Sequence, residues 1–416
     1  MSVQAAKQEV PRQRQRSDSI GLAPLANMAF NGTDLTPVWQ QLVKRVMTRP
    51  TDASALMDLA TIKLLTGDPA NGLALQAQAL GLRRIYEQQF AESSDSAAGP
   101  RGLRLLALMV PGDLMANTPL EFMLQGTDVT LYQLYMSPGQ ALPREIPDHD
   151  LAIVAIGESD QNRAVLGEMD RLVRSWPRPI LNLPRRIAAL SRDALCSNLK
   201  SAAGIMVPAT RRVERPQLDR IAGGGAPIGS VIEGVAFPII VRPTDSHAGQ
   251  GLLKIDDAGA LQEYLAARPE AEFYVSQFVD YSGPDGLFRK YRIALIDGVP
   301  FVCHMAISGH WMVHYLNAGM SENAAKRAEE AAFMASFEAG FAERHRAAFR
   351  ALADRVALEY FAVDCAESHD GRLLLFEADV AMIVHAMDPP ALYPYKGPQM
   401  RKVFAAFHAM LRRAAG

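Results

Sequence analysis

Two short apolar runs near the end of the chain, residues 360–367 and 373–379, flank the dipeptide Asp370-Gly371. Asp-Gly between two strand-like runs is a strong signal for a two-residue type I′ turn, because both central residues of that turn need a positive φ. A turn centred on this dipeptide places Asp364 directly opposite Glu377. The sequence therefore predicts a β-hairpin in which two acids face each other.

Three carboxylates share one face of this predicted hairpin. Opposed residues point to the same side of a sheet with Cβ atoms about 4.5–5.5 Å apart, and Asp379 lies two residues along from Glu377 on that side. The other face is expected to carry Val363, Cys365, Phe376 and Ala378. Opposed like charges destabilise a sheet unless a cation neutralises them, and Mg²⁺ prefers oxygen ligands. We therefore predict a metal site at these acids; the alternative is an exposed hairpin with solvated acids.

A second group of candidate residues follows the apolar run at 237–241. Arg242 ends this run, and a small glycine-containing loop separates it from the next apolar run. Backbone N–H groups of such a loop can hold phosphate oxygens, and an arginine can bind them through two parallel hydrogen bonds. The candidate phosphate-binding residues are Arg242, Ser246, His247, Gly249 and Gly251. The same pattern also suits an ordinary loop without a ligand.

The first hundred residues predict a tail and a helical region. Residues 1–20 lack apolar periodicity and predict a solvated tail. Within residues 21–100, apolar residues recur at helical spacing on both sides of Gly67-Asp68-Pro69, as far as Tyr86, and a small, polar linker follows at 91–100. This helical hairpin resembles one tetratricopeptide unit. A single unit cannot bury its own apolar face, so we expect it to pack on the rest of the chain.

The remaining residues predict two further units. Residues 101–185 alternate short apolar runs with helical patterns, which is typical of a parallel α/β domain. The run at 103–110 leads into Pro111-Gly112-Asp113 instead of a GxGxxG fingerprint, which disfavours a Rossmann dehydrogenase. Residues 186–416 separate runs of strands from long helices. The predicted fold class therefore combines α/β and α+β units.

Composition narrows the partners and the compartment. With 43 basic and 45 acidic side chains the formal charge is −2, so no global field recruits nucleic acid or an anionic membrane. No apolar run approaches the roughly 18–20 residues of a membrane span, and we expect a cytoplasmic protein. The three cysteines, Cys196, Cys303 and Cys365, are too few and too scattered for a disulfide framework or a CxxC zinc site.

These features together resemble the ATP-grasp superfamily. The resemblance rests on Arg192-Asp193 opening a helix that ends before Ala203-Gly204-Ile205-Met206-Val207-Pro208, on the strand at 238–243 with its glycine loop, and on the ending Phe376-Glu377-Ala378-Asp379. Within the superfamily, the chain is most similar to the branch of glutathione synthetase and the ribosomal-protein glutamate ligases. The resemblance covers roughly residues 101–416, with the α/β unit matching the family's preceding substrate domain.

The resemblance implies an enzyme that binds ATP between two α+β subdomains of residues 186–416. Such an enzyme phosphorylates a carboxylate to an acyl phosphate, and an amine then displaces phosphate to form an amide. It would need ATP and Mg²⁺, with Mn²⁺ as the alternative ion, and a small-molecule or peptide carboxylate and amine; a homodimer is compatible with it. The alternatives are a phosphotransferase of the same fold and a non-catalytic ATP-binding scaffold.

The resemblance also implies roles by position. Mg²⁺ would be held by Asp364, Glu377 and Asp379. ATP phosphates would contact Arg192 and Arg242, and Arg292 would face the acyl phosphate. The adenine would lie at a hinge of Gln277, Phe278 and Val279, with Asp280 near the ribose. The chain departs from the family in having arginine for lysine at residues 192 and 242, Glu-Ala-Asp for Glu-x-Asn at 377–379, and Lys290 where an acid commonly stands.

Other polar residues have simpler interpretations. His304, His310 and His314 are close in sequence, but their strand-like spacing does not form the helical face of a zinc site, and we expect His304 or His310 to line a substrate cleft. Asn317 suits either a loop near the metal or an ordinary turn. Glu329-Glu330 and the charges at 344–350 predict solvated helix faces, and Cys365 predicts a core residue.

Overall fold

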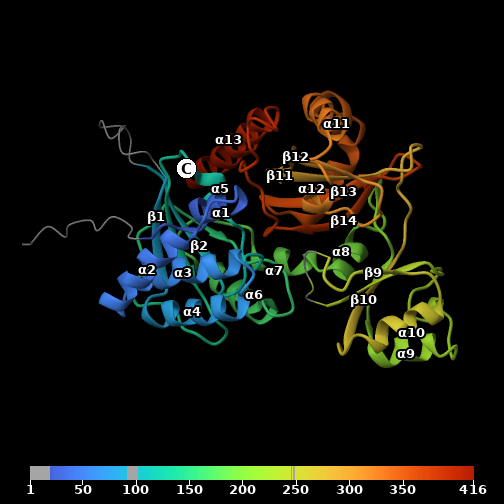
Figure 1. Cartoon of the computed structure of the whole chain (residues 1–416), viewed down its shortest axis with the longest axis horizontal. Helices are drawn as coiled ribbons and strands as arrows, with labels where there is room; N and C mark the ends of the chain where they lie inside the picture. The colour runs from blue at the N-terminus through green and yellow to red at the C-terminus, as the bar shows by residue number, and fades with distance from the viewer. Residues whose placement is uncertain (1–18, 91–101, 245, 247–248) are drawn as a thin grey trace, which may run out of the picture.

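The computed structural model describes residues 19–90, 102–244, 246 and 249–416. Three parts of the sequence analysis lie outside these residues: most of the predicted tail, the linker at 91–100, and His247. Figure 1 shows an N-terminal helical region beside a first sheet, and two further sheets in the C-terminal half. Among the described residues, no helix combines the length and the apolar character that a membrane span needs.

The described part of the N-terminal region contains four helices: α1 (Leu22–Phe30), α2 (Thr36–Thr48), α3 (Ala53–Leu65) and α4 (Pro69–Leu82). The predicted helical hairpin is confirmed as α3 and α4, whose first turns are capped by the carboxylates of Asp52 and Asp68. Tyr86 was assigned wrongly to the second helix. It lies in strand β1 (Ile85–Gln89), because these residues pair antiparallel with a neighbouring strand of the first sheet.

The start of the described chain is tied to this helical bundle. Ser19 Oγ, Ile20 N and Gly21 N donate to the buried carboxylate of Asp58 at 2.7, 2.8 and 3.0 Å. The prediction of a solvated tail up to residue 20 is therefore wrong for its last two residues, because a buried carboxylate needs hydrogen-bond donors and these residues supply them.

The first sheet confirms the predicted α/β unit. Its strand order is β1-β3-β2-β4-β5, with β2 (Arg104–Met109), β3 (Thr130–Tyr135), β4 (Leu151–Val154) and β5 (Ile180–Leu181) mutually parallel. Helix α5 (Leu120–Leu124) lies between β2 and β3, α6 (Arg163–Leu172) lies between β4 and β5, and α7 (Pro184–Ile187) follows β5. Both faces of β2 and β4 are buried, as expected for central strands of a covered parallel sheet.

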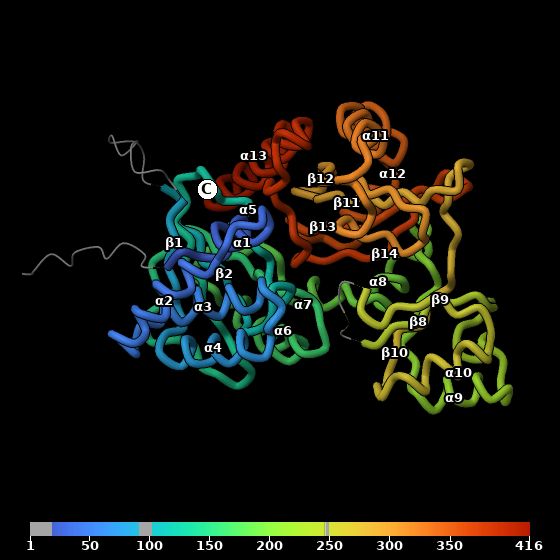
Figure 2. The backbone as a smooth tube through the Cα atoms, viewed as in Figure 1, coloured from blue at the N-terminus to red at the C-terminus, as the bar shows by residue number. Residues whose placement is uncertain are grey.

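Two mainly antiparallel sheets form the C-terminal half (Figures 1 and 2). The smaller has the order β7-β10-β8-β9, from β7 (Thr210–Glu214), β8 (Ile239–Pro243), β9 (Leu253–Ile255) and β10 (Glu272–Gln277). Two helices that the sequence analysis missed, α9 (Arg215–Ala222) and α10 (Ala258–Ala266), pack on it and share its apolar core. The combination of α/β and α+β units agrees with the predicted fold class.

The larger sheet has the order β12-β11-β13-β14-β6. Its strands are β6 (Ile205–Met206), β11 (Phe288–Ile296), β12 (Val299–Ser308), β13 (Tyr360–Glu367) and β14 (Leu373–Asp379). The surrounding helices are α8 (Arg192–Leu199), α11 (Ala324–Ala335), α12 (Arg346–Val356) and α13 (Lys396–Ala415). The strands β13 and β14 coincide with the two predicted apolar runs at 360–367 and 373–379.

The acidic hairpin β13–β14 has the predicted acid pair but not the predicted turn. Gly371 has φ 76°, whereas Asp370 does not have a positive φ, and Gly371 N donates to Ser368 O at 2.9 Å. The loop is therefore longer than two residues. A β-bulge then compensates: Cys365 pairs with Leu375, but Asp364 pairs with Glu377.

The bulge also corrects the predicted position of Phe376. This ring was expected on the face opposite the acids, yet it lines the cavity and lies 5.0 Å from the ring of Tyr281. The physical reason is the extra residue in β14, which breaks the strict alternation of side chains along the strand. Cys365 is fully buried in the core, as predicted.

Candidate active site

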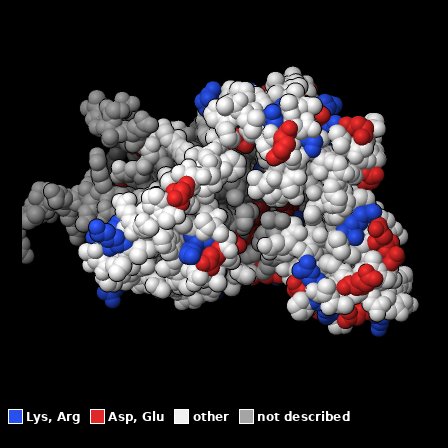
Figure 3. All heavy atoms as spheres, in the orientation of Figure 1, with Lys and Arg blue, Asp and Glu red and all other residues white. Residues whose placement is uncertain are grey.

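A cavity of about 670 Å³ lies where the two C-terminal sheets and the N-terminal region meet. Its walls come from strands β8, β10, β11, β12 and β14, from the segments that follow β12 and β14, and from α1. Figure 3 shows that basic and acidic side chains are mixed on the surrounding surface. Of the thirteen predicted site residues that the structure describes, ten line this cavity; Ser246, Gly251 and Asp280 do not.

Arg242 is the last charged residue of β8 and is buried, with 8% of its surface exposed. Its Nε donates to Ser246 Oγ at 3.0 Å, and a terminal nitrogen donates to the carbonyl oxygen of Ser246. Burial, with a contribution from Arg192, lowers the pKa of Arg242 to about 9. Among the described residues no carboxylate forms an ion pair with it, so this buried cation is suited to a negatively charged ligand.

Arg192 opens α8 and forms an ion pair with Glu377 on β14. Burial alone would raise the pKa of Glu377, but Arg192 and Arg242 hold that pKa below its ordinary value. A recess of about 50 Å³ beside the main cavity is lined by Arg192, Arg242, Ser246, Glu377 and Asp379, and by a third acid, Glu158. The structure therefore brings two predicted phosphate contacts and two predicted metal ligands to one place.

Asp364 does not line that recess, and its carboxylate forms ion pairs with other side chains. Lys290 Nζ lies 2.9 Å from Oδ2, and Arg292 donates from Nε to Oδ1 at 2.8 Å and from Nη2 to Oδ2 at 3.1 Å. Burial acts in the opposite direction, yet Arg292 and Lys290 hold the pKa of Asp364 far below its usual range. Both carboxylate oxygens are occupied.

The predicted metal site of three carboxylates is therefore wrong as stated. Within the described ranges, no group of three or more His, Cys, Asp or Glu side chains is arranged to hold a metal ion. The cation that the opposed acids require is supplied by side chains, since Lys290 and Arg292 neutralise Asp364 while Arg192 neutralises Glu377.

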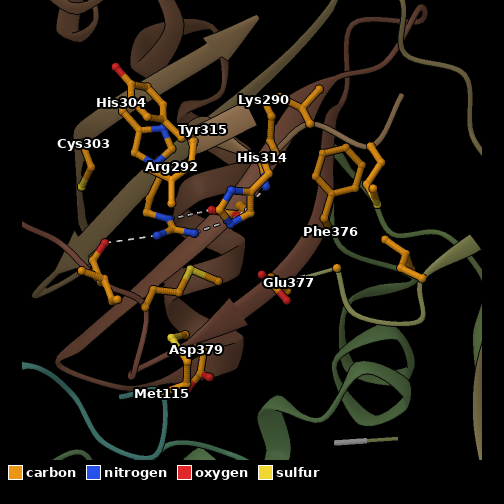
Figure 4. Close-up of a pocket in the computed structure, with 18 of the residues that line it drawn as sticks. Met115, Lys290, Arg292, Cys303, His304, His314, Tyr315, Phe376, Glu377 and Asp379 are labelled. Atoms are coloured by element: carbon orange, nitrogen blue, oxygen red, sulfur yellow. Dashed lines mark hydrogen bonds and ion pairs between the residues drawn. The ribbon is translucent and has the colours of Figure 1, made fainter. Parts of the chain in front are cut away.

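Glu377 and Asp379 still fit a divalent ion. Both line the recess, and Figure 4 shows them on the same side of the pocket, away from Arg292 and His304. Burial raises the pKa of Asp379 to about 6, and no ion pair to this carboxylate is found in the described part of the chain. Mg²⁺ at nucleotide sites is commonly held by one or two carboxylates plus phosphate oxygens. Asp364 does not fit, because its oxygens already accept from two cations.

The predicted adenine hinge lies at the cavity, but the predicted ribose contact does not. Gln277, Phe278 and Val279 all line the cavity, and the ring of Phe278 lies 5.8 Å from that of Trp311. Asp280 is exposed and does not line it. Its carboxylate accepts from Ser282 N at 2.9 Å, so it serves the local turn.

The glycine loop is divided between the cavity and the fold. Gly249 lines the cavity, whereas Gly251 does not, and this part of the prediction is wrong. Gly251 has φ 66°, and a Cβ there would lie 2.7 Å from Pro243 Cδ. Its carbonyl accepts from Tyr264 OH at 2.7 Å. The backbone of the loop requires this glycine, whether or not a phosphate binds.

Two of the three predicted histidines line the cavity and one does not. His304 and His314 line the cavity, while His310 is exposed and outside it. The Nδ1 atom of His304 is buried without a hydrogen-bond partner in the described part of the structure, and burial together with Arg292 holds the pKa of His304 well below its ordinary value. Asn317 lines the cavity, and Cys303 lies in its wall.

A buried polar network at the cavity was missed by the sequence analysis. Glu330 was predicted to be solvated, but its side chain is fully buried and accepts from Met305 N, Tyr395 OH and Tyr315 OH at 3.0, 2.7 and 3.2 Å. Lys396 lies 3.6 Å from Glu330 and 3.2 Å from Asp388. Helical spacing contained the signal, because Glu330 stands one turn before the buried Met334.

The N-terminal helix α1 packs against α5 and against the segment that follows β14. Ala23 and Ala26 of α1 form a buried cluster with Phe122, against which Ile383 and Met387 pack. Ala23 N donates to the buried Glu121 at 3.0 Å. Helix α1 is therefore part of the cavity wall, a contribution that the sequence analysis did not foresee.

No protein-family model and no curated protein matches the sequence. Similar solved structures include an ATP-grasp RimK domain protein from Sphaerobacter thermophilus DSM 20745, which is 17% identical, covers 75% of this chain and 99% of that chain, and gives a TM-score of 0.41. Another is the D-alanine–D-alanine ligase from Bacillus anthracis complexed with ATP, at 12% identity, 75% and 96% coverage, and a TM-score of 0.44. Both scores are low, and the function is therefore inferred from the geometry of this chain's own residues.

Proposed function

We propose that this chain is an ATP-dependent carboxylate–amine ligase of the ATP-grasp superfamily, which forms an amide bond through an acyl-phosphate intermediate. The single observation that carries the proposal is the recess where Arg192 and Arg242 meet Glu377 and Asp379. Arginines bind phosphate oxygens, and carboxylates bind the divalent ion that accompanies a triphosphate. Both kinds of group face each other across the space between the two C-terminal sheets.

Arg242 and Arg192 hold the phosphate groups. The guanidinium of Arg242 is buried and oriented by Ser246, so it is preorganised before a ligand arrives. Arg192 forms an ion pair with Glu377, and this contact holds the guanidinium of Arg192 beside the recess. Transfer of a phosphoryl group depends mainly on such positioning and on electrostatic stabilisation.

Glu377 and Asp379 hold the divalent ion. A Mg²⁺ ion held by these carboxylates would supply positive charge that offsets the negative charge on the transferred group. Asp379 is held in place by the backbone N–H of Ala381 at 3.1 Å, and Glu377 by Arg192. The ring of Phe278 and the side chains of Gln277 and Val279 form the wall for the adenine.

The reaction joins two substrates in the part of the cavity beside Arg292. A substrate carboxylate attacks the γ-phosphorus of ATP, ADP leaves, and an acyl phosphate forms. The nitrogen of the amine then attacks the acyl carbon, phosphate leaves, and the nitrogen loses a proton. Arg292 is fixed by Asp364 and by Ile383 O, to which its Nη1 donates at 3.1 Å, so its positive charge has a defined place near the acyl group.

The proposal is tested by measuring ADP release with Mg²⁺ and ATP over a set of amino acids and short peptides, with mass spectrometry of the products. An amide product together with free phosphate supports the ligase. A stable phosphorylated product would instead identify a phosphotransferase. Nucleotide binding without turnover of any substrate pair would identify a scaffold.

A further inference from the structure

The cavity extends from the recess at Arg242 to an end that is formed by apolar side chains. Helix α1 contributes residues one and two turns apart, which share one face of a helix: Leu22, Ala26, Ala29 and Phe30. The facing wall comes from α5 and its entry and from the segment after β14: Pro119, Phe122, Ile383 and Met387. This end of the cavity, defined by these eight residues, is termed the apolar chamber.

The two walls of the apolar chamber are in contact with each other around His385. The imidazole lies between the rings of Phe30 and Phe122, at centroid distances of 5.4 and 6.3 Å. Its Nδ1 accepts from Met387 N at 3.1 Å. Burial lowers the pKa of His385 to about 4, so the ring is neutral at neutral pH. The chamber therefore presents apolar side chains and one uncharged imidazole.

Helix α1 is fixed in place at its first turn. Backbone N–H groups of Ile20 and Gly21 donate to Asp58, and that of Ala23 donates to Glu121, at 2.8 to 3.0 Å. Both carboxylates are buried, which makes these contacts costly to break. The wall that α1 forms is thus preformed, as is usual for sites that select small molecules.

The apolar chamber adjoins the reaction centre. Ile383 contributes its side chain to the chamber and its carbonyl oxygen to Arg292, at 3.1 Å from Nη1. Two cations that line the same cavity are already paired, with Lys396 at 3.2 Å from Asp388 and Arg292 on Asp364. A ligand group that extends from Arg292 past Ile383 enters a neutral, apolar space.

We propose that the apolar chamber binds the side chain of one of the two substrates, so that this substrate carries an aliphatic or aromatic group of about the size of leucine or phenylalanine. The inference rests on the proposed function, which places the reacting groups at Arg292. Burial of apolar surface would then supply selectivity, since one methylene group in a hydrophobic pocket changes discrimination by about 10-fold or more.

Equilibrium binding to the full chain tests this inference. The protein is loaded with Mg²⁺ and a non-hydrolysable ATP analogue, and L-leucine, L-phenylalanine, glycine and L-glutamate are titrated calorimetrically. We expect leucine or phenylalanine to bind about 10-fold tighter than glycine and glutamate. Equal or weaker binding of the apolar amino acids would overturn the inference.

Substitutions in the chamber give a second, directional readout. Ala29→Leu reduces its volume and should weaken phenylalanine about 10-fold more than leucine, whereas Phe30→Ala enlarges it and should shift the ratio the other way. Asn27→Leu is the matched control, because Asn27 lies on the exposed face of α1. A leucine-to-phenylalanine ratio that is the same in all three variants would contradict a role of α1 in selection.

Binding of the ATP analogue separates the two proposals. If the unsubstituted protein does not bind it, the proposed function fails. If the analogue binds with equal affinity to all variants but apolar amino acids have no advantage, the apolar chamber alone fails. If the analogue binds and the two chamber variants shift selectivity in opposite directions, both proposals are supported.

Discussion

Arg292 and Asp364 stand opposite each other on the neighbouring strands β11 and β13, and the guanidinium contacts both carboxylate oxygens. Lys290 adds a second cation at 2.9 Å, while only 3% of the Asp364 side chain is exposed. This internal pairing supplies the positive charge that the sequence analysis assigned to a metal ion. It makes Asp364 a structural anchor of the cavity floor rather than an available ligand.

Replacing Asp364 should destabilise the protein. Asp364→Asn leaves Arg292 and Lys290 without their carboxylate in a buried place, and breaking a buried pair from one side typically costs about 3–5 kcal/mol. We expect the free energy of unfolding in urea to fall by that order. Asp370→Asn, in the exposed loop of the same hairpin, is the matched control. A melting transition unchanged by Asp364→Asn would show that the ion pair does not stabilise the fold.

Replacing Arg242 should act on the nucleotide instead. Arg242→Ala removes a charge-assisted contact worth about 1.5–3 kcal/mol, which corresponds to roughly 10- to 100-fold in the Kd for ATP. Because the cation is buried without a carboxylate partner among the described residues, the fold should keep its stability. Calorimetric ATP titration measures the effect, with the exposed Arg220→Ala as control. Equal ATP affinity in the two variants would remove Arg242 from the site.

Asp379→Asn should separate metal binding from folding. Burial raises the pKa of this carboxyl to about 6, so its charge is unfavourable in the empty protein. We expect an equal or higher melting temperature without ligands, but at least about 10-fold weaker Mg²⁺-dependent ATP binding, since one of two carboxylate ligands is lost. Asp354→Asn, at an exposed position of α12, is the control. Undiminished Mg²⁺ dependence would show that Asp379 does not hold the ion.

Truncation at the N-terminus should have a sharp threshold. Removing residues 1–18 leaves every described contact of Asp58 in place, and we expect an unchanged melting temperature. Removing residues 1–21 deprives this buried carboxylate of three donors, each worth about 1–3 kcal/mol when lost. Differential scanning calorimetry of the two truncated proteins measures the difference. Two identical transitions would contradict the anchoring of α1 at Asp58.

The pH dependence of stability should contain a contribution from His385. Its pKa is about 4 in the folded protein, below the ordinary value of about 6.5, so between these values the unfolded chain binds a proton that the folded chain does not. The free energy of unfolding therefore falls as the pH drops through this window, by at most about 1.4 kcal/mol per pH unit. His385→Asn keeps an acceptor for Met387 N and should remove this contribution. The free energy of unfolding in urea is measured at pH 7.5 and 5.0 for the unsubstituted protein and for His385→Asn. An equal change between the two pH values in both proteins would refute the contribution of His385.

The pattern of apolar residues predicted the strands well where most residues of the strand are buried. The strands of the β13–β14 hairpin and the parallel strands of the first sheet follow from runs of apolar residues, because most residues of these runs are buried. The helices α9 and α10 were missed because each is short, with eight and nine residues, and so carries only two or three buried apolar residues at helical spacing. Tyr86 was assigned to a helix because apolar spacing cannot show that the chain has begun to pair with a distant strand.

The sequence predicted which residues lie at the candidate site better than it predicted which ion pairs those residues form. Arg192, Arg242, Glu377 and Asp379 meet at one recess, as expected from the resemblance. The partner of Asp364 could not be read from the sequence, because Lys290 and Arg292 approach from a strand more than seventy residues away. Glu330 was misjudged for the related reason that a charge in a helix is assumed to be solvated unless its partners are known.

Because of the bulge at Phe376, the length of the loop in the β13–β14 hairpin does not affect the pairing of the acids at the far end of the hairpin. A tight turn with a straight ladder and a longer loop with one inserted residue both leave Asp364 opposite Glu377. The longer loop therefore changes the pairing register of the two strands only between the loop and the bulge. The inserted residue places one aromatic ring at the cavity and against Tyr281, while Asp364 and Glu377 remain paired beyond it. A single residue of extra chain thus gives the cavity an aromatic floor without moving its charges.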